Sequence, residues 1–307
     1  MELIVSIIGY GNVGKLIAAL LLPYKKYSLH INIIDTDSNV RGAVLDFEHG
    51  AELYDSHSIS FNSQDLLNQS DFIFHCAGAS VPRGQSRLVT TKASIEITEA
   101  VFSGFRPLKT PFVIVVANPV EVISAITQII TGLPRQKVVG TGTFLDSLRM
   151  NHAVKSLMGE ATTVDSVLLG EHGSTAFLSR QLSSLNTKSF DVALNQDTIN
   201  ELMEKVKGSA SKIKETQEAC IYGVSYCAIK VFEALLSVEG RSIPVSTFVP
   251  QSLEPVLGTT HAYVSLYAWI NTGGVHPIED YQPNTEELES LKKSLTTISA
   301  CLPAQYV

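Results

Sequence analysis

The sequence predicts an α/β fold, in which a doubly wound parallel sheet in the first half is followed by a smaller, mixed α+β domain. Up to about Gly140, short apolar runs alternate with amphipathic stretches, a pattern typical of βαβ units around a buried parallel sheet. Beyond that point, helical and strand-like patterns no longer alternate regularly. The 307 residues suffice for two domains, which we place at residues 1–140 and 141–307.

The elements are expected in the following order. The first half predicts strands at 3–8, 31–34, 72–75, 112–116 and 137–139, and helices at 15–22, 40–48, 91–105 and 120–130. The second half predicts a helix at 147–158, a strand at 164–169, and a long helical stretch at 198–237 that Gly208 interrupts. Strands at 245–249 and 263–270 precede a last helix at 285–300. Because no Ser/Gly-rich linker separates the halves, we expect a cleft between two packed domains.

Composition and charge exclude several classes of protein. The chain has 23 Lys+Arg against 30 Asp+Glu, a net charge of −7, and its charges are scattered, so we expect no nucleic-acid partner. The longest apolar run, 16–22, falls far below the ~20 residues that cross a bilayer, and the first residues do not resemble a signal peptide. We therefore expect a cytoplasmic protein with no membrane partner. The four cysteines lack metal-ligand spacing, so we expect reduced thiols and no metal site.

A glycine-rich turn follows the first expected strand. It reads GYGNVG, the GxGxxG pattern, with Asn12 and Val13 between its glycines. Gly9 suits a tight turn, Gly11 lets the backbone approach a pyrophosphate, and Gly14 permits close packing of the next helix. The N-terminus of that helix attracts phosphate charge. The pattern predicts a dinucleotide site in a Rossmann fold.

An acidic residue ends the second expected strand. Asp35 lies 21 residues after Gly14, where a carboxylate accepts hydrogen bonds from ribose hydroxyls and repels a 2′-phosphate. The predicted cofactor is therefore NAD rather than NADP.

Two further segments carry side chains suited to proton transfer and anion binding. His172 follows an expected strand and is framed by Gly170 and Gly173, so its imidazole can reach a cleft and exchange protons near neutral pH. Asp146 and Arg149 stand three residues apart on one face of an expected helix. Taken alone, His172 could be structural and the Asp/Arg pair a surface ion pair. A Gly/Pro-containing loop before residues 84–88 can act as a lid.

Together these motifs resemble the NAD-dependent lactate/malate dehydrogenase family over nearly the whole chain. The matching motifs occur in the family's order, at Gly9–Gly14, Asp35, 42–50, 77–79, 86–88, 117–120, 142–149, 170–173 and 244–247.

The resemblance implies an oxidoreductase that interconverts a 2-oxo acid and an L-2-hydroxy acid by hydride transfer. His172 resembles the family's general acid and base, and Asp146 its buried partner that favours the imidazolium. Arg149 resembles the fork that binds the substrate carboxylate, and Arg87 the lid residue that polarises the carbonyl. Asn118 would contact the substrate oxygen and the nicotinamide ribose.

The same resemblance implies further contacts and an assembly. Ala77 and Gly78 match a cofactor-binding motif of the family. The family is oligomeric, and apolar faces on the expected helices 40–48 and 147–158 would suit a homodimer or a homotetramer.

The chain departs from the family at the positions that select the substrate. Val81 lies six residues before Arg87, where lactate enzymes of the family usually carry Gln and malate enzymes carry Arg. A dicarboxylate needs a cation there, so Val81 favours pyruvate or a larger apolar 2-oxo acid. Arg83 could replace that cation, which leaves a malate dehydrogenase as the alternative. Glu218, in an expected helix near 217–219, either faces the pocket and repels a dicarboxylate or points to solvent.

The sequence leaves two hypotheses of a different functional class. An idle homologue would hold NAD without catalysis, although intact His172, Asp146, Arg149 and Arg87 argue against it. An NAD-using glycosidase would need Cys and His ligands for a metal around Asn118 and His172, and the sequence places no such cluster there.

Overall fold

The computed structural model describes residues 2–80, 87–259 and 262–306. Its largest sheet among these residues has nine strands, in the order β14-β13-β12-β6-β5-β4-β1-β2-β3. Six neighbouring strands are parallel, namely β1 (Glu2–Ile8), β2 (Ser28–Ile34), β3 (His57–Phe61), β4 (Phe72–His75), β5 (Phe112–Val115) and β6 (Val138–Gly140). The strand order reverses between β1 and β4, which is where doubly wound sheets bind ligands. The predicted Rossmann-type fold is confirmed.

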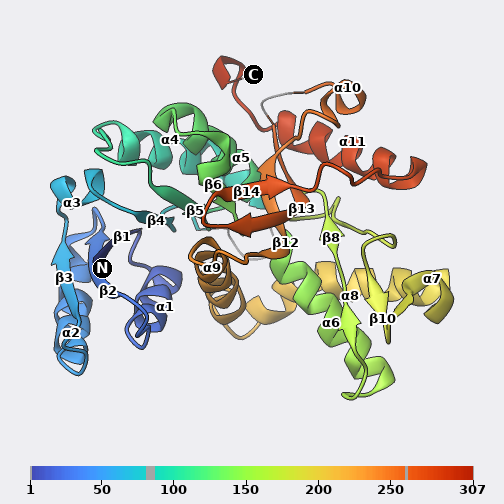
Figure 1. The fold of residues 1–307 in the computed structure, drawn as a ribbon, viewed down its shortest axis with the longest axis horizontal. Helices are drawn as coiled ribbons and strands as arrows, with labels where there is room; N and C mark the ends of the chain where they lie inside the picture. Colours follow the sequence, from blue (N-terminus) through green and yellow to red (C-terminus); the bar gives the residue numbers. More distant parts are fainter. Residues whose placement is uncertain (1, 81–86, 260–261, 307) are drawn as a thin grey trace.

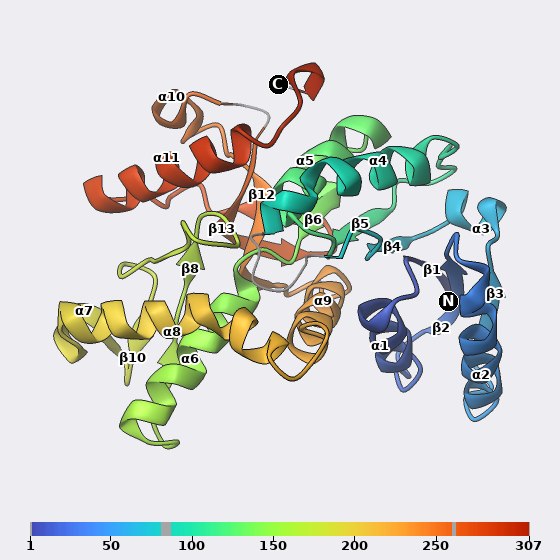
Figure 2. The same cartoon turned by 180° about the vertical axis from the view of Figure 1, so that it is seen from behind.

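Helices cover both faces of this sheet (Figures 1 and 2). One face carries α1 (Asn12–Leu21), α2 (Arg41–Ala51) and α9 (Tyr222–Leu235), which share a buried apolar core with β1 and β2. The other face carries α3 (Gln64–Asn68), α4 (Thr91–Phe102), α5 (Val120–Thr131) and α11 (Thr285–Ser299), around a second core. Because strand residues alternate between the two faces, Val5 and Ile7 enter the first core whereas Ile8 enters the second.

The sheet continues into the second half of the chain. Three antiparallel strands, β12 (Arg241–Phe248), β13 (Tyr263–Asn271) and β14 (Gly274–Pro277), extend it where Ser246 of β12 pairs with Gly140 of β6. The division predicted near residue 140 stays a prediction, since one sheet spans both halves.

The rest of the second half packs beside the antiparallel edge. Helices α6 (Phe144–Met158) and α8 (Gln196–Lys214) enclose a third core with several short elements. These are β7 (Val164–Asp165), β8 (Leu168–Leu169), β9 (Phe177–Leu178), β10 (Ser184–Leu185), β11 (Lys188–Ser189) and α7 (Phe190–Ala193). A further short helix, α10 (Glu254–Leu257), lies between β12 and β13, and 3₁₀ turns occur at Ser38–Val40, Arg87–Thr90, Arg135–Lys137 and Ala304–Tyr306.

Three sequence expectations differ from the structure. The single strand expected at 164–169 is interrupted, because β7 and β8 belong to different sheets. The helical break predicted at Gly208 is wrong, because α8 runs through this exposed glycine and the chain leaves the helix only after Lys214. A glycine inside a helix costs only about 1 kcal/mol, and the buried stripe of Ile199, Leu202 and Val206 holds α8 together. The helix expected near 217–219 is also wrong, since these residues form a bend between α8 and α9.

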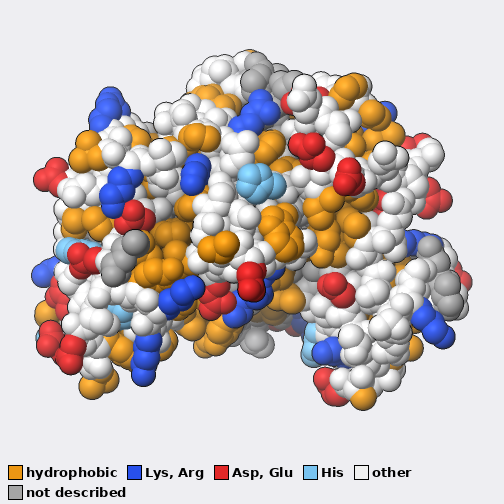
Figure 3. Space-filling model, viewed as in Figure 1, with side chains coloured by type: hydrophobic (Ala, Val, Ile, Leu, Met, Phe, Trp, Pro, Cys, Tyr) orange, Lys and Arg blue, Asp and Glu red, His pale blue; other side chains and the backbone are white. Residues whose placement is uncertain are grey.

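The surface visible in Figure 3 carries Lys and Arg side chains interspersed with Asp and Glu. Among the described helices, none is both long and apolar enough to traverse a bilayer.

Candidate active site

The glycine turn between β1 and α1 gives each glycine a different reason for lacking a side chain. Gly9 has φ +91°, and a Cβ there would lie 2.6 Å from the backbone nitrogen of Ala77. A Cβ on Gly14 would lie 2.0 Å from the Gly9 carbonyl oxygen, so this glycine lets α1 pack against the turn. A Cβ on Gly11 would meet no described atom within 4 Å. Open space above Gly11 leaves room for a ligand to approach the backbone.

The start of α1 is suited to an anion. Gly11 is the N-cap, and no side chain of the described residues caps the helix there. Asn12 and Val13 begin the helix and are at least partly accessible, so their N–H groups lie at its positive end. These residues therefore fit a pyrophosphate, as the sequence motif predicts.

Asp35 lies beside this turn, directly after β2. Its Oδ2 accepts a hydrogen bond from the Tyr10 N–H at 2.6 Å, and its Oδ1 accepts one from the Asp37 N–H at 2.9 Å. The backbone thereby holds a half-buried carboxylate next to the glycine turn. A carboxylate retains lone pairs beyond these two bonds, so it can accept further bonds from ribose hydroxyls.

Two more loops leave the same edge of the sheet. Ala77 and Gly78 follow β4, and Asn118 follows β5. A Cβ on Gly78 would lie 3.2 Å from the Cβ of Ala117, so the two loops pack closely. The Oδ1 atom of Asn118 is buried and has no hydrogen-bond partner among the described residues. Such an atom costs about 1–3 kcal/mol unless a ligand donates to it, so Asn118 fits a ligand contact.

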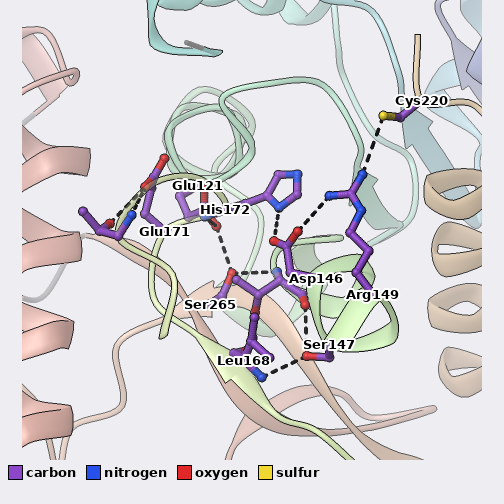
Figure 4. A network of polar contacts seen from close by, with 11 residues as sticks. Glu121, Asp146, Ser147, Arg149, Leu168, Glu171, His172, Cys220 and Ser265 are labelled. Atoms are coloured by element: carbon purple, nitrogen blue, oxygen red, sulfur yellow. Dashed lines mark hydrogen bonds and ion pairs between the residues drawn. The ribbon is translucent and has the colours of Figure 1, made fainter. Parts of the chain in front are cut away.

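The candidate chemical groups meet between α6 and the loop after β8 (Figure 4). Asp146 Oδ2 lies 2.5 Å from His172 Nδ1, and Asp146 Oδ1 accepts a hydrogen bond from Arg149 NH1 at 2.9 Å. All three side chains are about nine-tenths buried. The carboxylate therefore holds an imidazole and a guanidinium at once, and this ion pair is not on the surface.

Arg149 has one further contact. Its NH2 lies 3.6 Å from the sulfur of Cys220, which stands in the bend between α8 and α9. Glu218, two residues earlier in that bend, is exposed to solvent, so its pocket role stays a prediction. The backbone of Arg87 begins a 3₁₀ turn, whereas its side chain and the whole of Val81 and Arg83 lie outside the described residues.

Behind His172 lies a carboxyl group that the sequence reasoning missed. Glu121, in the first turn of α5, is only 2% exposed, and its Oε1 accepts hydrogen bonds from the His172 backbone N–H and the Ser265 hydroxyl. Burial, reinforced by the nearby charge of Glu171, raises the pKa of Glu121 to about 8. Acidic residues are common in the first turn of a helix, so the sequence pattern did not single out Glu121.

The chain is similar to known proteins along almost its whole length. Residues 3–140 match the NAD-binding domain of lactate/malate dehydrogenases, and residues 143–303 match their α/β C-terminal domain. An L-lactate dehydrogenase of Clostridium botulinum (strain Loch Maree) is 26% identical over 97% of this chain and 95% of its own length. An L-lactate dehydrogenase of Halalkalibacterium halodurans is 28% identical over 96% and 94%.

Solved structures of both enzyme types share the fold. A malate dehydrogenase from Plasmodium falciparum superposes with a TM-score of 0.87 at 21% identity, covering 97% of both chains. An L-lactate dehydrogenase from Clostridium thermocellum superposes with a TM-score of 0.81 at 25% identity, covering 97% of this chain and 98% of that one. With both family domains matched along almost its whole length, this chain belongs to the lactate/malate dehydrogenase family and is an NAD-dependent hydroxyacid dehydrogenase.

Proposed function

We propose that the chain interconverts a monocarboxylic 2-oxo acid and the corresponding L-2-hydroxy acid, as a lactate dehydrogenase-type enzyme. The observation that carries this proposal is the buried arrangement of His172, Asp146 and Arg149. It combines a proton donor, the carboxylate that orients it, and a cation for the substrate carboxylate. When bound, the cofactor would supply the hydride in its reduced form for reduction of the oxo acid, and would take it up in its oxidised form in the reverse direction.

His172 serves as the general acid and base. A carboxylate can only accept a hydrogen bond, so Asp146 Oδ2 requires a proton on His172 Nδ1. The ring therefore exchanges its second proton at Nε2, giving it to the 2-oxo oxygen during reduction and removing it from the hydroxyl during oxidation. The negative charge of Asp146 stabilises the imidazolium that oxidation leaves on His172.

Arg149 binds the substrate carboxylate. One of its five N–H donors serves Asp146 and NH2 contacts the Cys220 sulfur, so further donors remain for a two-point contact with a carboxylate. Arg87 takes the carbonyl-polarising role when its loop closes over the substrate, a role that rests on the family motif at 86–88.

Gly11, Asn12, Val13 and Asp35 hold the cofactor, with Gly9 and Gly14 shaping the turn. Ala77, Gly78 and Asn118 contact it from the neighbouring strand ends. The Asn118 oxygen, buried without a described partner, supports this assignment.

Val81 selects a monocarboxylate. An aliphatic side chain offers a dicarboxylate no partner for its second charge, and an unpaired charge in a closed site is strongly disfavoured. The Clostridium botulinum and Halalkalibacterium halodurans relatives are both L-lactate dehydrogenases, which supports the same choice. The alternative is a malate dehydrogenase in which Arg83 supplies the cation.

The test compares kcat/KM for pyruvate, 2-oxobutyrate and oxaloacetate with NADH, for the wild type and for Val81→Arg. We expect the wild type to prefer a monocarboxylate by about tenfold or more, and Val81→Arg to shift this ratio towards oxaloacetate by about 100-fold. A wild type that prefers oxaloacetate refutes the role of Val81, and Arg83→Ala then shows whether Arg83 binds the second carboxylate. NADH binding without turnover of any substrate would favour the idle homologue.

We also propose that the chain self-associates through α2, α6 and α9. Each of these helices exposes large apolar side chains, including Leu45 on α2, Leu148 on α6, and Tyr222 and Tyr226 on α9. Light scattering after size exclusion is expected to give the mass of a dimer or a tetramer. A monomer at micromolar concentration would contradict this proposal.

A further inference from the structure

We propose that Glu121 is a positioning residue for His172, and that it acts by joining the His172 loop to helix α6 through the hydroxyl of Ser265. This inference rests on the proposed function of His172 as the proton donor and acceptor. It adds a carboxyl group whose bond to His172 is made through the backbone N–H.

The connection consists of three hydrogen bonds, two of which are drawn in Figure 4 around Ser265. The backbone N–H of Thr143 donates to Ser265 Oγ at 3.1 Å, and the Ser265 hydroxyl donates to Glu121 Oε1 at 2.9 Å. The backbone N–H of His172 donates to the same Glu121 oxygen at 3.1 Å. Thr143 is the N-cap of α6, the helix that carries Asp146.

His172 is consequently held at two points. Its backbone nitrogen is fixed by Glu121, and its Nδ1 is fixed by Asp146 at 2.5 Å. Both partners depend on the position of the α6 N-terminus, because Asp146 lies on that helix and Glu121 reaches it through Ser265. The pair Glu121–Ser265 therefore helps to fix the distance between the imidazole of His172 and the carboxylate of Asp146, because it holds the backbone of His172 relative to α6.

The loop needs such an anchor because glycines flank it. Gly170 has φ +98°, and Gly173 follows His172 directly. Glycine has more backbone freedom than any other residue, so ordering this loop costs more entropy than ordering an ordinary one. Backbone bonds between Gly170 and Ser265 at 2.9 Å secure the start of the loop, and Glu121 secures His172 itself.

Burying the carboxyl group of Glu121 costs desolvation free energy, and packing alone gives no reason for a carboxyl group at this position. Glu121 is buried among the apolar side chains of α5, where an apolar residue would avoid the desolvation of a carboxyl group. Its neighbour Glu171 is buried as well, but turns its own Oε2 to Thr175. Since burial raises the pKa of Glu121 to about 8, the neutral acid is favoured at pH 7, and its acceptor oxygen rather than its charge makes the contacts.

Variants of Glu121 can separate the role of its acceptor oxygen from that of its charge. Glu121→Gln keeps an acceptor oxygen and carries no charge, whereas Glu121→Leu removes the acceptor at similar volume. Glu287→Leu is the matched control, because Glu287 is also a buried carboxyl that accepts bonds from two hydroxyls, and these belong to Ser179 and Tyr281 rather than to the groups that donate to Glu121. Both Leu variants are expected to lower the melting temperature.

Two readouts separate positioning from general destabilisation. We expect Glu121→Leu to lower kcat by about 10- to 100-fold, with the KM for NADH unchanged, while Glu121→Gln and Glu287→Leu stay within about threefold of the wild type. The basic limb of the pH profile for reduction moves to lower pH in Glu121→Leu, because a loosened Asp146 stabilises the imidazolium less. The second readout is the low-field proton resonance of His172 Nδ1–H, assigned by its loss in His172→Gln.

The NMR readout does not depend on turnover. We expect the resonance in the wild type, Glu121→Gln and Glu287→Leu, and its loss or exchange broadening in Glu121→Leu. An unchanged resonance and kcat in a folded Glu121→Leu protein would overturn the inference. So would an equal loss of kcat in Glu287→Leu. A wild type that shows the resonance but turns over no 2-oxo acid would instead refute the proposed function, and the effect of Glu121→Leu on the resonance would still decide the inference.

Discussion

Replacing Asp146 with Asn is the perturbation that tests the proposed chemistry most sharply. The carboxylate lies 2.5 Å from His172 Nδ1 and 2.9 Å from Arg149 NH1, and all three side chains are about nine-tenths buried. Little solvent is therefore available to replace its negative charge. A hydrogen bond to a charged partner contributes about 1.5–3 kcal/mol, and 1.36 kcal/mol corresponds to a tenfold change in rate. Asp146→Asn should thus lower kcat for reduction by about 10- to 150-fold.

The substrate KM should change less than kcat in Asp146→Asn. Arg149 loses the partner that competes for its NH1, so its attraction for the substrate carboxylate is maintained. The assay follows NADH absorbance at saturating cofactor, and NADH affinity, measured by fluorescence, serves as the control because the glycine turn is untouched. If kcat in a folded Asp146→Asn protein stays within about threefold of the wild type, the proposed orienting role of Asp146 is wrong.

Three further predictions concern the cofactor site and the buried carboxyl. Gly14→Ala should destabilise the fold by about 1–3 kcal/mol, since its Cβ would lie 2.0 Å from a carbonyl oxygen, whereas Gly11→Ala should keep the melting temperature and weaken NADH binding. Equal effects on the melting temperature would contradict this contrast. Asp35→Asn should reduce the preference for NADH over NADPH, measured as the ratio of their dissociation constants, and an unchanged ratio would remove Asp35 from the ribose site. For Glu121, the folded state keeps its proton up to about pH 8, whereas the unfolded chain loses it near pH 4.5, so this group's contribution to stability is full below pH 4.5 and declines as the pH rises to about 8. Between pH 5 and 8, urea unfolding should therefore show a smaller loss of stability in Glu121→Gln than in the wild type, and equal losses would contradict the raised pKa.

The cofactor half of the site could be read from the sequence because its requirements are local. Gly9 needs a positive φ, and Gly14 needs the absence of a side chain, and both needs appear directly in the GxGxxG pattern. The position of Asp35 follows from the length of one βαβ unit. The parallel strands were likewise predictable, apart from β3, which lies at the sheet edge and whose five residues, HSISF, include only two apolar side chains, neither of them fully buried.

The contacts of Glu121 and Ser265 that hold the backbone of His172 could not be predicted from the sequence. Glu121 and Ser265 are 144 residues apart and meet only because β13 joins the sheet next to β12, which itself pairs with β6. Nothing local marks either residue, since a Glu in a first helical turn and a Ser in a strand are ordinary. The extent of α8 was missed for the opposite reason, because Gly208 is a local signal that the buried face of the helix overrides.

The most direct test of the central claim is NADH consumption with pyruvate by the wild type and by His172→Ala, at equal cofactor occupancy. We expect turnover by the wild type and a loss of about 100-fold or more in kcat for His172→Ala, with NADH affinity unchanged, because only the proton donor is removed. Equal turnover by the two proteins would contradict the assignment of His172 as the general acid and base.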